Sequence, residues 1–173
     1  MKTTTLLHLA LACTSLCASN IVRADEPLAP PQSRKILAPS GNCWAYTDIA
    51  SNATTVFRRS KGKTSKLWSI DGWYRVAALA SDCEHFVTGY DGVNLLPENF
   101  APDTVILSFY SNGSLIRRVT LRELVNDLSK LEKTASHWSW GHYVGIERRT
   151  HYRIATVDRG EIVFDMKTGL LID

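Results

Sequence analysis

Residues 105–119, VILSFYSNGSLIRRV, contain the clearest β-hairpin signal in the chain. Residues 105–110 are apolar on both faces of an extended strand apart from Ser108, which is typical of a buried strand. Asn112 and Gly113 follow, and both tolerate the positive φ angles of a tight two-residue turn. The return over Leu115–Val119 completes the hairpin, so this stretch favours a fold built from antiparallel strands.

Short strands are also predicted on both sides of this hairpin. They are separated by polar turns such as residues 61–63, 158–160 and 165–169. The predicted strands are residues 43–49, 54–58, 67–70, 76–79, 85–90, 138–140, 143–147, 152–157 and 161–164. The sequence therefore predicts a mainly β (α+β) fold of antiparallel meanders with one inserted helix.

The inserted helix is predicted directly after the hairpin. Thr120 and Glu123 have the spacing of a capping box. Apolar residues then recur at helical spacing, at Leu121, Leu124, Val125, Leu128 and Leu131. We expect this amphipathic helix to dock on the core by that face, and a partner-binding helix is the alternative.

Two segments that lie 40 residues apart suggest a repeat. Residues 40–43 and 80–83 each end in cysteine before a predicted strand, at the period of a propeller blade. Residues 164–169, FDMKTG, are similar to the Asp-to-Thr-Gly turn of quinoprotein-type blades, and residues 79–87 to the Ser-Asp turn and following strand of blade repeats generally, although the Trp-Asp pair of propeller repeats is absent.

On these motifs the chain resembles secreted bacterial proteins with propeller-like β-meander repeats. The resemblance implies blade-like meanders over residues 40–172. Because about 130 residues make roughly three blades, fewer than the four of the smallest ring, we do not expect a complete propeller.

The first 24 residues predict a secretory signal peptide. Lys2 supplies the positive start, and the apolar run over residues 6–16 is shorter than the roughly 20 residues that a membrane-spanning helix needs. Cleavage is expected after Ala24, with Ala18 as the second choice, and a lipoprotein modified at Cys13 is the alternative. No later segment is long and apolar enough to span a membrane, so we expect a secreted or periplasmic protein.

The remaining chain is predicted to be a flexible leader and one domain. Residues 25–39 hold four of the six prolines, and residues 40–173 form the single β-rich domain. Cys13 and Cys17 lie in the predicted signal peptide. Cys43 and Cys83 remain as a pair in an oxidising compartment, so a disulfide is predicted, with two buried thiols as the alternative.

The composition is that of an ordinary globular protein, with 45% hydrophobic and 21% charged residues. The formal net charge is +3, and the loss of Lys2 and Arg23 with the signal peptide reduces it to +1. We therefore expect no nucleic-acid partner and no concentrated basic patch.

No sequence motif predicts a particular enzymatic chemistry. The chain has no HExxH or Cys-x-x-Cys pattern, no Gly-x-Ser-x-Gly elbow and no glycine-rich phosphate loop. We expect no metal, no cofactor and no catalytic residues, and predict a binding or interaction module for a protein, small molecule or glycan. The alternative is a small periplasmic hydrolase in which His85, His137 or His142 meets a serine and a carboxylate in a concave site.

The candidate binding residues lie around a long loop and a tryptophan pair. Residues 91–103 have no predicted secondary structure, and loops of this length are often functional. Alternating tryptophans on an extended strand would share one face, where they could stack on a sugar, although core packing is the alternative. The predicted set is Tyr90, Asp91, Asn94, Trp138, Trp140 and His142.

Overall fold

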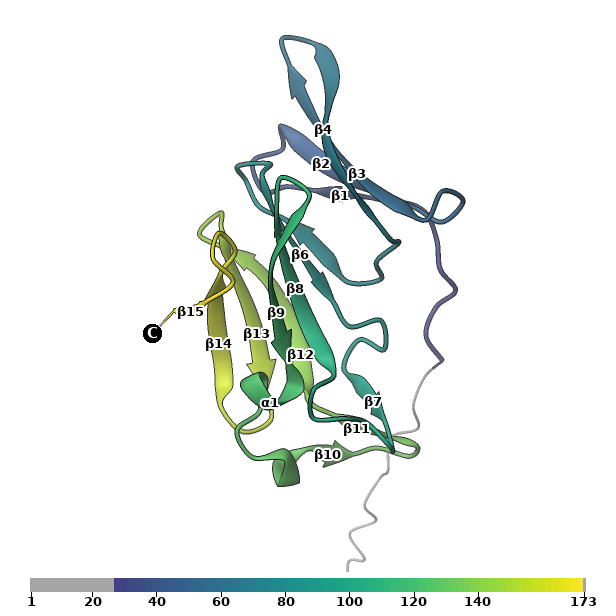
Figure 1. Ribbon diagram of the computed structural model, residues 1–173, viewed down its shortest axis with the longest axis vertical. Helices are drawn as coiled ribbons and strands as arrows, with labels where there is room; N and C mark the ends of the chain where they lie inside the picture. The colour runs from purple at the N-terminus through teal and green to yellow at the C-terminus, as the bar shows by residue number, and fades with distance from the viewer. Residues whose placement is uncertain (1–26, 173) are drawn as a thin grey trace, which may run out of the picture.

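The computed structural model describes residues 27–172. Strands make up 53% of these residues, in four antiparallel sheets of which none closes into a barrel. Figure 1 shows the most N-terminal sheet at one end of the molecule and the other three sheets beside and below it. The prediction of a mainly β fold with incomplete, propeller-like meanders is confirmed. The predicted signal peptide, with Cys13 and Cys17, lies outside the described residues.

Three of the sheets are four-stranded, with the strands in the order in which the chain reaches them. Sheet A consists of β1 (Arg34–Leu37), β2 (Cys43–Asp48), β3 (Ala53–Ser60) and β4 (Lys63–Asp71). Sheet B consists of β5 (Ala77–Leu79), β6 (His85–Gly89), β8 (Val105–Ser111) and β9 (Ser114–Thr120). Sheet D consists of β12 (Gly141–Glu147), β13 (His151–Thr156), β14 (Gly160–Asp165) and β15 (Leu171–Ile172).

The β8–β9 hairpin forms as the sequence predicts. Ser111 pairs with Ser114, and Asn112 and Gly113 have φ angles of 49° and 85° in the turn between them. Ile106, Leu107 and Phe109 of β8 are fully buried. The local turn signal and the apolar strand therefore agree with the tertiary structure.

Four short strands lie where the sequence predicts none: β1 and β15 near the two ends of the described chain, and two more in the connections between predicted strands. β1 lies within the segment predicted as a leader and pairs with β2, placing Arg34 opposite Thr47. β7 (Leu95–Pro97) lies within the predicted loop and pairs with β11 (His137–Ser139), so the expectation of no secondary structure there is wrong. Together with β10 (Glu132–Lys133), β7 and β11 form the small sheet C.

The predicted helix begins correctly but is much shorter than its apolar pattern indicates. Glu123 accepts the Thr120 N–H at 2.7 Å, as a capping box requires, but α1 spans only Leu121–Leu124. Beyond the helix, the N–H groups of Asn126 and Asp127 donate to the Asp158 carboxylate at 2.7 and 3.0 Å. They therefore do not donate to the carbonyls of the preceding turn, as they would if the helix continued. The chain resumes as the 3₁₀ helix η1 (Leu128–Lys130).

The expected docking of the apolar face on the core is confirmed. Leu121, Leu124, Val125 and Leu131 are buried, and Leu128 is half-buried against the same core. Within residues 27–172, neither α1 nor η1 has the length and apolar character that a membrane crossing requires.

The molecule has two hydrophobic cores. The larger is shared by sheets B and D, where the rings of Phe109 and Phe164 lie 5.7 Å apart. The smaller lies between sheets A and B and includes Val56, Trp68 and Phe86. Each four-stranded sheet has a face in one of these cores, and the surface cavities described next are lined by residues from all four sheets and their connections.

Candidate functional site

Two adjoining cavities share Asn94 and His142, two of the residues predicted to bind a ligand. The Ser139 cavity has a volume of about 440 Å³, and the Arg34 cavity about 410 Å³. Such volumes fall within the range of about 300–1,000 Å³ that small-molecule sites occupy. The Ser139 cavity is lined by Asn94, Glu132, Ser139, Gly141, His142, Ala155, Thr156 and Val157. The Arg34 cavity is lined by Arg34, Arg75, Val76, Ala77, Val93, Asn94, His142 and Tyr143.

Asn94 is fixed between the loop and sheet C. Its side-chain N–H donates to the Ser139 hydroxyl at 3.3 Å, and its backbone carbonyl accepts the Trp140 N–H at 3.3 Å. The Asn94 side chain retains a carbonyl oxygen and a second N–H that make no hydrogen bond within residues 27–172. These two groups, one acceptor and one donor, are available to a ligand where the cavities meet.

His142 reaches the same place because Gly141 allows the chain to pass directly from β11 to β12. Gly141 has a φ of 143°, and a Cβ atom there would lie 2.0 Å from the Ala155 carbonyl oxygen. Only glycine fits this close approach. His142 follows, opposite Ala155 in the β12–β13 register, with an exposed imidazole that makes no hydrogen bond among the described residues. Both ring nitrogens are therefore open to a ligand.

Two arginines, neither of them among the predicted site residues, give the Arg34 cavity a positive wall. Arg34 donates to the Arg75 backbone carbonyl at 2.5 Å, and both residues line the cavity. Arg75 donates to Asp91 at 3.1 Å and to the Ala29 carbonyl at 2.5 Å, and its guanidinium lies 5.2 Å from the Trp73 ring centroid. The Arg75 side chain is only 17% exposed and is held in place by these contacts, whereas that of Asp91 is 74% exposed.

The opposite end of the pair of cavities is polar and carries a carboxylate. Glu132 is exposed on β10, and Thr156 closes β13 with its hydroxyl 3.3 Å from an Asp158 oxygen. Hydrogen-bond acceptors therefore predominate at this end and guanidinium donors at the other.

The other predicted residues support the site without lining it. The Tyr90 N–H donates to the Tyr143 hydroxyl at 2.8 Å, and burial raises the pKa of Tyr143 well above its ordinary value. Asp91 contributes the ion pair with Arg75. Trp138 is half-buried against the larger core, with the Lys133 ammonium 4.9 Å from its ring centroid.

Trp140 is fully buried and donates its indole N–H to the Val93 carbonyl at 3.1 Å. Its ring lies edge-on to Tyr143, with the centroids 5.1 Å apart. Trp140 therefore packs in the core, which was the alternative to stacking on a sugar. Its indole hydrogen bond holds the cavity-lining loop to the sheet.

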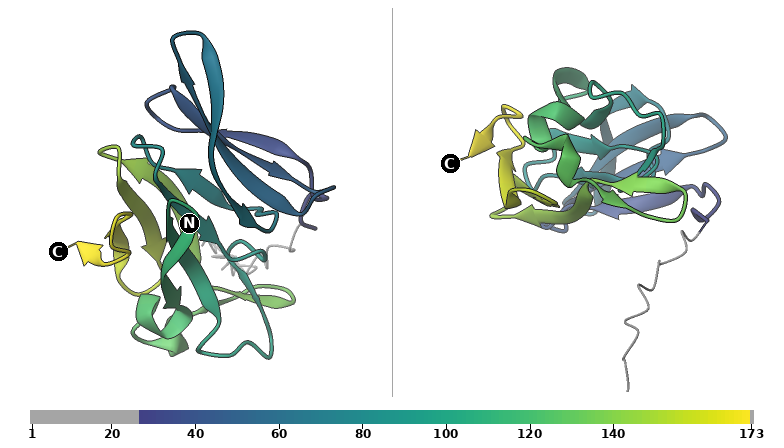
Figure 2. Two further views of the ribbon diagram at one scale, coloured as in Figure 1. Left: turned by 45° about the horizontal axis from the view of Figure 1, so that its top comes forward. Right: turned by 90° about the horizontal axis from the view of Figure 1, so that it is seen from below.

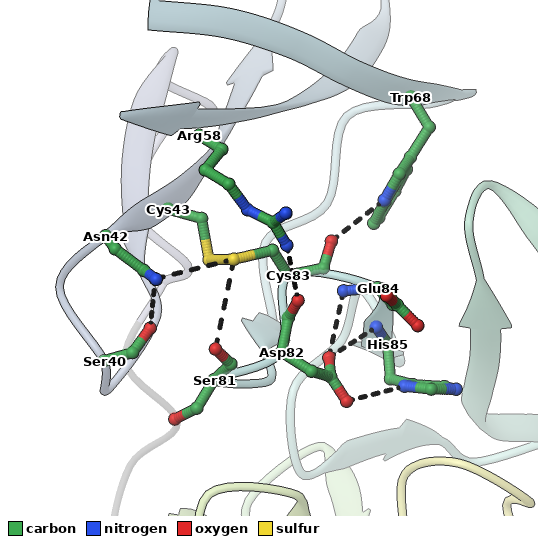
Figure 3. Close-up of a disulfide and its surroundings, with 10 residues drawn as sticks. All are labelled: Ser40, Asn42, Cys43, Arg58, Trp68, Ser81, Asp82, Cys83, Glu84 and His85. Atoms are coloured by element: carbon green, nitrogen blue, oxygen red, sulfur yellow. Dashed lines mark hydrogen bonds and ion pairs between the residues drawn. A yellow bond between two sulfur atoms is a disulfide. The ribbon is translucent and has the colours of Figure 1, made fainter. Parts of the chain in front are cut away.

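The hydrolase alternative requires a histidine close to a serine and a carboxylate. Each of its three candidate histidines lies close to at least one of these two groups. His85 Nδ1 lies 2.8 Å from an Asp82 oxygen, in the β5–β6 turn, but the Ser81 side chain points away from it (Figure 3). His137 Nδ1 lies 2.9 Å from the hydroxyl of Ser136, which is exposed in the β10–β11 turn. Neither histidine lines the two cavities.

His142 does share the Ser139 cavity with a serine and a carboxylate. No hydrogen bond within the described part of the chain joins His142 to Ser139 or to Glu132, and the Ser139 hydroxyl accepts from Asn94 instead. A nucleophile–base hydrogen bond, which serine catalysis requires, is therefore not formed here. Among residues 27–172, no group of three or more His, Cys, Asp or Glu residues is arranged to hold a metal ion.

Comparison with known proteins gives no family assignment. No family model matches the chain, and no curated protein sequence matches it. Among solved structures, the chain is similar to a Bacteroides fragilis protein described as a candidate 6-phosphogluconolactonase, with 12% sequence identity and a TM-score of 0.40. The match covers 81% of this chain and 36% of that one. A likeness at this level identifies neither a shared fold nor a shared activity.

Proposed function

We propose that this protein is a secreted or periplasmic, non-enzymatic binding module for a small polar ligand. The ligand occupies the junction of the Ser139 and Arg34 cavities. The observation that carries the proposal is that Asn94 and His142 line both cavities and offer hydrogen-bonding groups that the described chain leaves unused. The Cys43–Cys83 disulfide supports the compartment, because such bonds persist mainly outside the cytoplasm.

The lining favours a hydroxylated small acid, such as a sugar acid. Arg34 and Arg75 offer guanidinium groups to a carboxylate at one end. The Asn94 amide and the His142 imidazole can bond hydroxyl groups where the cavities meet, and the Glu132 carboxylate can do so at the other end.

Binding is favoured over hydrolysis because the polar groups surround a space without forming a catalytic arrangement. Ser139 is only 9% exposed, and its hydroxyl is engaged by Asn94. The hydrolase in which Ser139, His142 and Glu132 act together stays the second candidate, since all three line one cavity.

Calorimetric titration of the purified protein with glucuronate, galacturonate and gluconate tests the proposal, with glucose and galactose as uncharged comparisons. We expect at least one acid to bind more tightly than its neutral counterpart. Asn94→Ala combined with His142→Ala should weaken this binding at least about tenfold, the effect of losing one or two well-made hydrogen bonds.

The matched control is Asn99→Ala combined with Val144→Ala. Both residues are exposed, Val144 is on the same strand as His142, and neither lines the two cavities. Binding of no compound in the panel, or equal affinity in the two double variants, would overturn the proposal.

A further inference from the structure

The positive charge of the molecule is concentrated in sheet A. Residues 34–71 contain seven basic and two acidic side chains, a net charge of +5, whereas residues 72–172 contain eleven basic and twelve acidic ones, a net charge of −1. The stretch 58–66, RRSKGKTSK, holds five of these basic residues in nine positions. The expectation that no basic patch exists is therefore wrong, because the small net charge of the whole chain conceals this asymmetry.

The β3–β4 hairpin carries the basic stretch away from the rest of the molecule. Its turn is formed by Lys61 and Gly62, with φ angles of 48° and 77°, and Ser60 pairs with Lys63 across it. Figures 1 and 2 show the hairpin, drawn in blue, projecting beyond the other sheets. All residues from 59 to 67 are exposed.

The cations of this hairpin are not neutralised by the protein. Arg58 differs from the others because its guanidinium is bound by the rest of the protein, donating to the Asp82 carbonyl at 2.9 Å. Five other basic side chains of sheet A form no ion pair within residues 27–172. Four belong to the stretch 58–66 and one to β1: Arg59, Lys61, Lys63, Lys66 and Lys35.

Two aromatic rings lie among these cations on one face of sheet A. Trp44 and Phe57 are directly opposite each other in the β2–β3 register, with ring centroids 5.8 Å apart, and Lys66 is opposite Phe57 on β4. The Lys35 ammonium lies 4.1 Å, and the Arg59 guanidinium 5.7 Å, from the Trp44 ring centroid. The surface thus alternates flat apolar rings with positive charges.

We infer that this surface, which we term the basic face, binds a linear acidic polysaccharide bearing carboxylate or sulfate groups. A polymer with regularly repeated negative charge complements a row of five unpaired cations. The apolar faces of sugar rings can pack on the half-buried rings of Trp44 and Phe57 between those charges. An anionic membrane fits less well, because the projecting residues 58–66 contain no apolar side chain and the rings of Trp44 and Phe57 are half-buried in sheet A, where they cannot enter a bilayer deeply.

Protection of a sheet edge accounts for only part of this charge. β4 is an edge strand of sheet A, and lysines on an edge strand discourage pairing with other molecules. This explains Lys63 and Lys66. Lys61, however, lies in the turn between β3 and β4 and not on an edge strand, and so needs another explanation.

The test compares two triple variants of the full chain that remove the same amount of charge. The hairpin variant is Arg59→Gln, Lys61→Gln and Lys63→Gln. The control variant is Arg118→Gln, Lys130→Gln and Lys167→Gln, three exposed basic residues outside sheet A. Affinity for polygalacturonate and heparin is measured at low salt and at about 0.5 M salt, with neutral dextran as the uncharged polymer. Size-exclusion chromatography and thermal melting verify that each variant has the oligomeric state of the wild type and is folded.

We expect the wild-type protein to bind both acidic polymers, but not dextran, and to lose affinity as salt increases. The hairpin variant should bind at least about tenfold more weakly, from the loss of three charge contacts, and the control variant within about twofold of wild type. Phosphatidylcholine vesicles containing phosphatidylglycerol, and oligothymidylate, serve as the other anionic partners.

Equal weakening in the two variants would overturn the inference. So would tighter binding to the vesicles or to oligothymidylate than to either polysaccharide, which would identify a membrane or a single-stranded nucleic acid as the partner. A hairpin variant that retains its affinity and instead aggregates would show that the lysines only protect the edge of β4.

Discussion

Cys43 and Cys83 are joined by a disulfide that links sheet A to sheet B, with their Cα atoms 5.9 Å apart. Cys43 is the first residue of β2, and Cys83 lies in the turn between β5 and β6. Two hydrogen bonds from sheet A reach the same turn: the Trp68 indole donates to the Cys83 carbonyl at 3.0 Å, and Arg58 donates to that of Asp82 (Figure 3). Sheet A is thus held to the rest of the molecule by a small core and one covalent link.

The double variant Cys43→Ala, Cys83→Ala should be substantially less stable than the oxidised wild type. A link between residues 40 positions apart restricts the unfolded chain, and the loop-entropy model gives a loss of roughly 4 kcal/mol. Urea unfolding of the oxidised protein, the reduced protein and the variant measures this difference. A reducing agent should not affect the variant, and equal midpoints for all three samples would contradict the prediction.

Asp82 should make stability depend on pH in the acid range. Burial alone would raise the pKa of Asp82, but the N–H groups of Glu84 and His85 and the His85 imidazole hold it below its ordinary value of 3.8. Because the pKa is lower in the folded state, the stabilisation is complete above the unfolded value and is lost as pH falls through the folded one.

The Asp82→Asn variant should therefore be about 1–2 kcal/mol less stable at pH 7, and this difference should shrink below about pH 4. Urea midpoints measured at intervals from pH 7 down to about pH 2 provide the test. Asp103→Asn, at an exposed position outside this turn, is the control. A difference that stays constant down to the lowest pH would show that the Asp82 charge contributes nothing.

Two leucines of the predicted helix should differ in their contribution to stability. Leu124 is fully buried, so Leu124→Ala should cost about 2–5 kcal/mol through lost contacts and the cavity it leaves. Leu128 is only half-buried, at the start of η1, so Leu128→Ala should cost less than Leu124→Ala. Thermal and urea unfolding of the two variants decide the point, and a greater loss for Leu128→Ala would contradict the packing described here.

The sequence predicted most successfully those features whose signals are local. The β8–β9 hairpin was predictable because Asn112 and Gly113 define its turn within a few residues. The helix was overestimated because Asp158, 32 residues from Asn126, takes the N–H groups that would have extended it. β7 was missed because a three-residue strand is stabilised by its pairing with the distant β11, and carries no pattern of its own.

The residues of the candidate site were likewise predictable from the sequence only where a local signal marks them. Asn94 and His142 could be singled out because each stands beside a recognisable feature, a long loop and a tryptophan pair. Arg34 and Arg75 could not, since no sequence motif marks either of them and Arg34 reaches the cavity only when β1 joins sheet A. The basic stretch 58–66 was visible in the sequence, and was overlooked because charge was summed over the whole chain.

Ser139 distinguishes a binding site from a hydrolytic one. If the protein only binds its ligand, Ser139→Ala should change affinity for a bound sugar acid by no more than a few-fold, because the Ser139 hydroxyl is buried and contacts Asn94. The wild type should also not release products from fluorogenic esters, lactones or glycosides. Turnover that disappears in both Ser139→Ala and His142→Ala would establish the hydrolase instead.

The ion pair of Arg75 and Asp91 should adjust the preference of the site for acids. Asp91 lies beside the Arg34 cavity and offsets part of the positive charge of Arg75. Asp91→Asn should therefore strengthen the binding of a sugar acid by about two- to fivefold, the scale of one partly exposed charge interaction.

Arg75→Gln should weaken acid binding and leave affinity for the neutral sugar nearly unchanged. Titration of both variants with the acid and the neutral sugar separates charge recognition from a loss of fold, since misfolding would reduce both affinities together. If the two variants shift acid binding in the same direction, the carboxylate of the ligand does not face the Arg34 cavity.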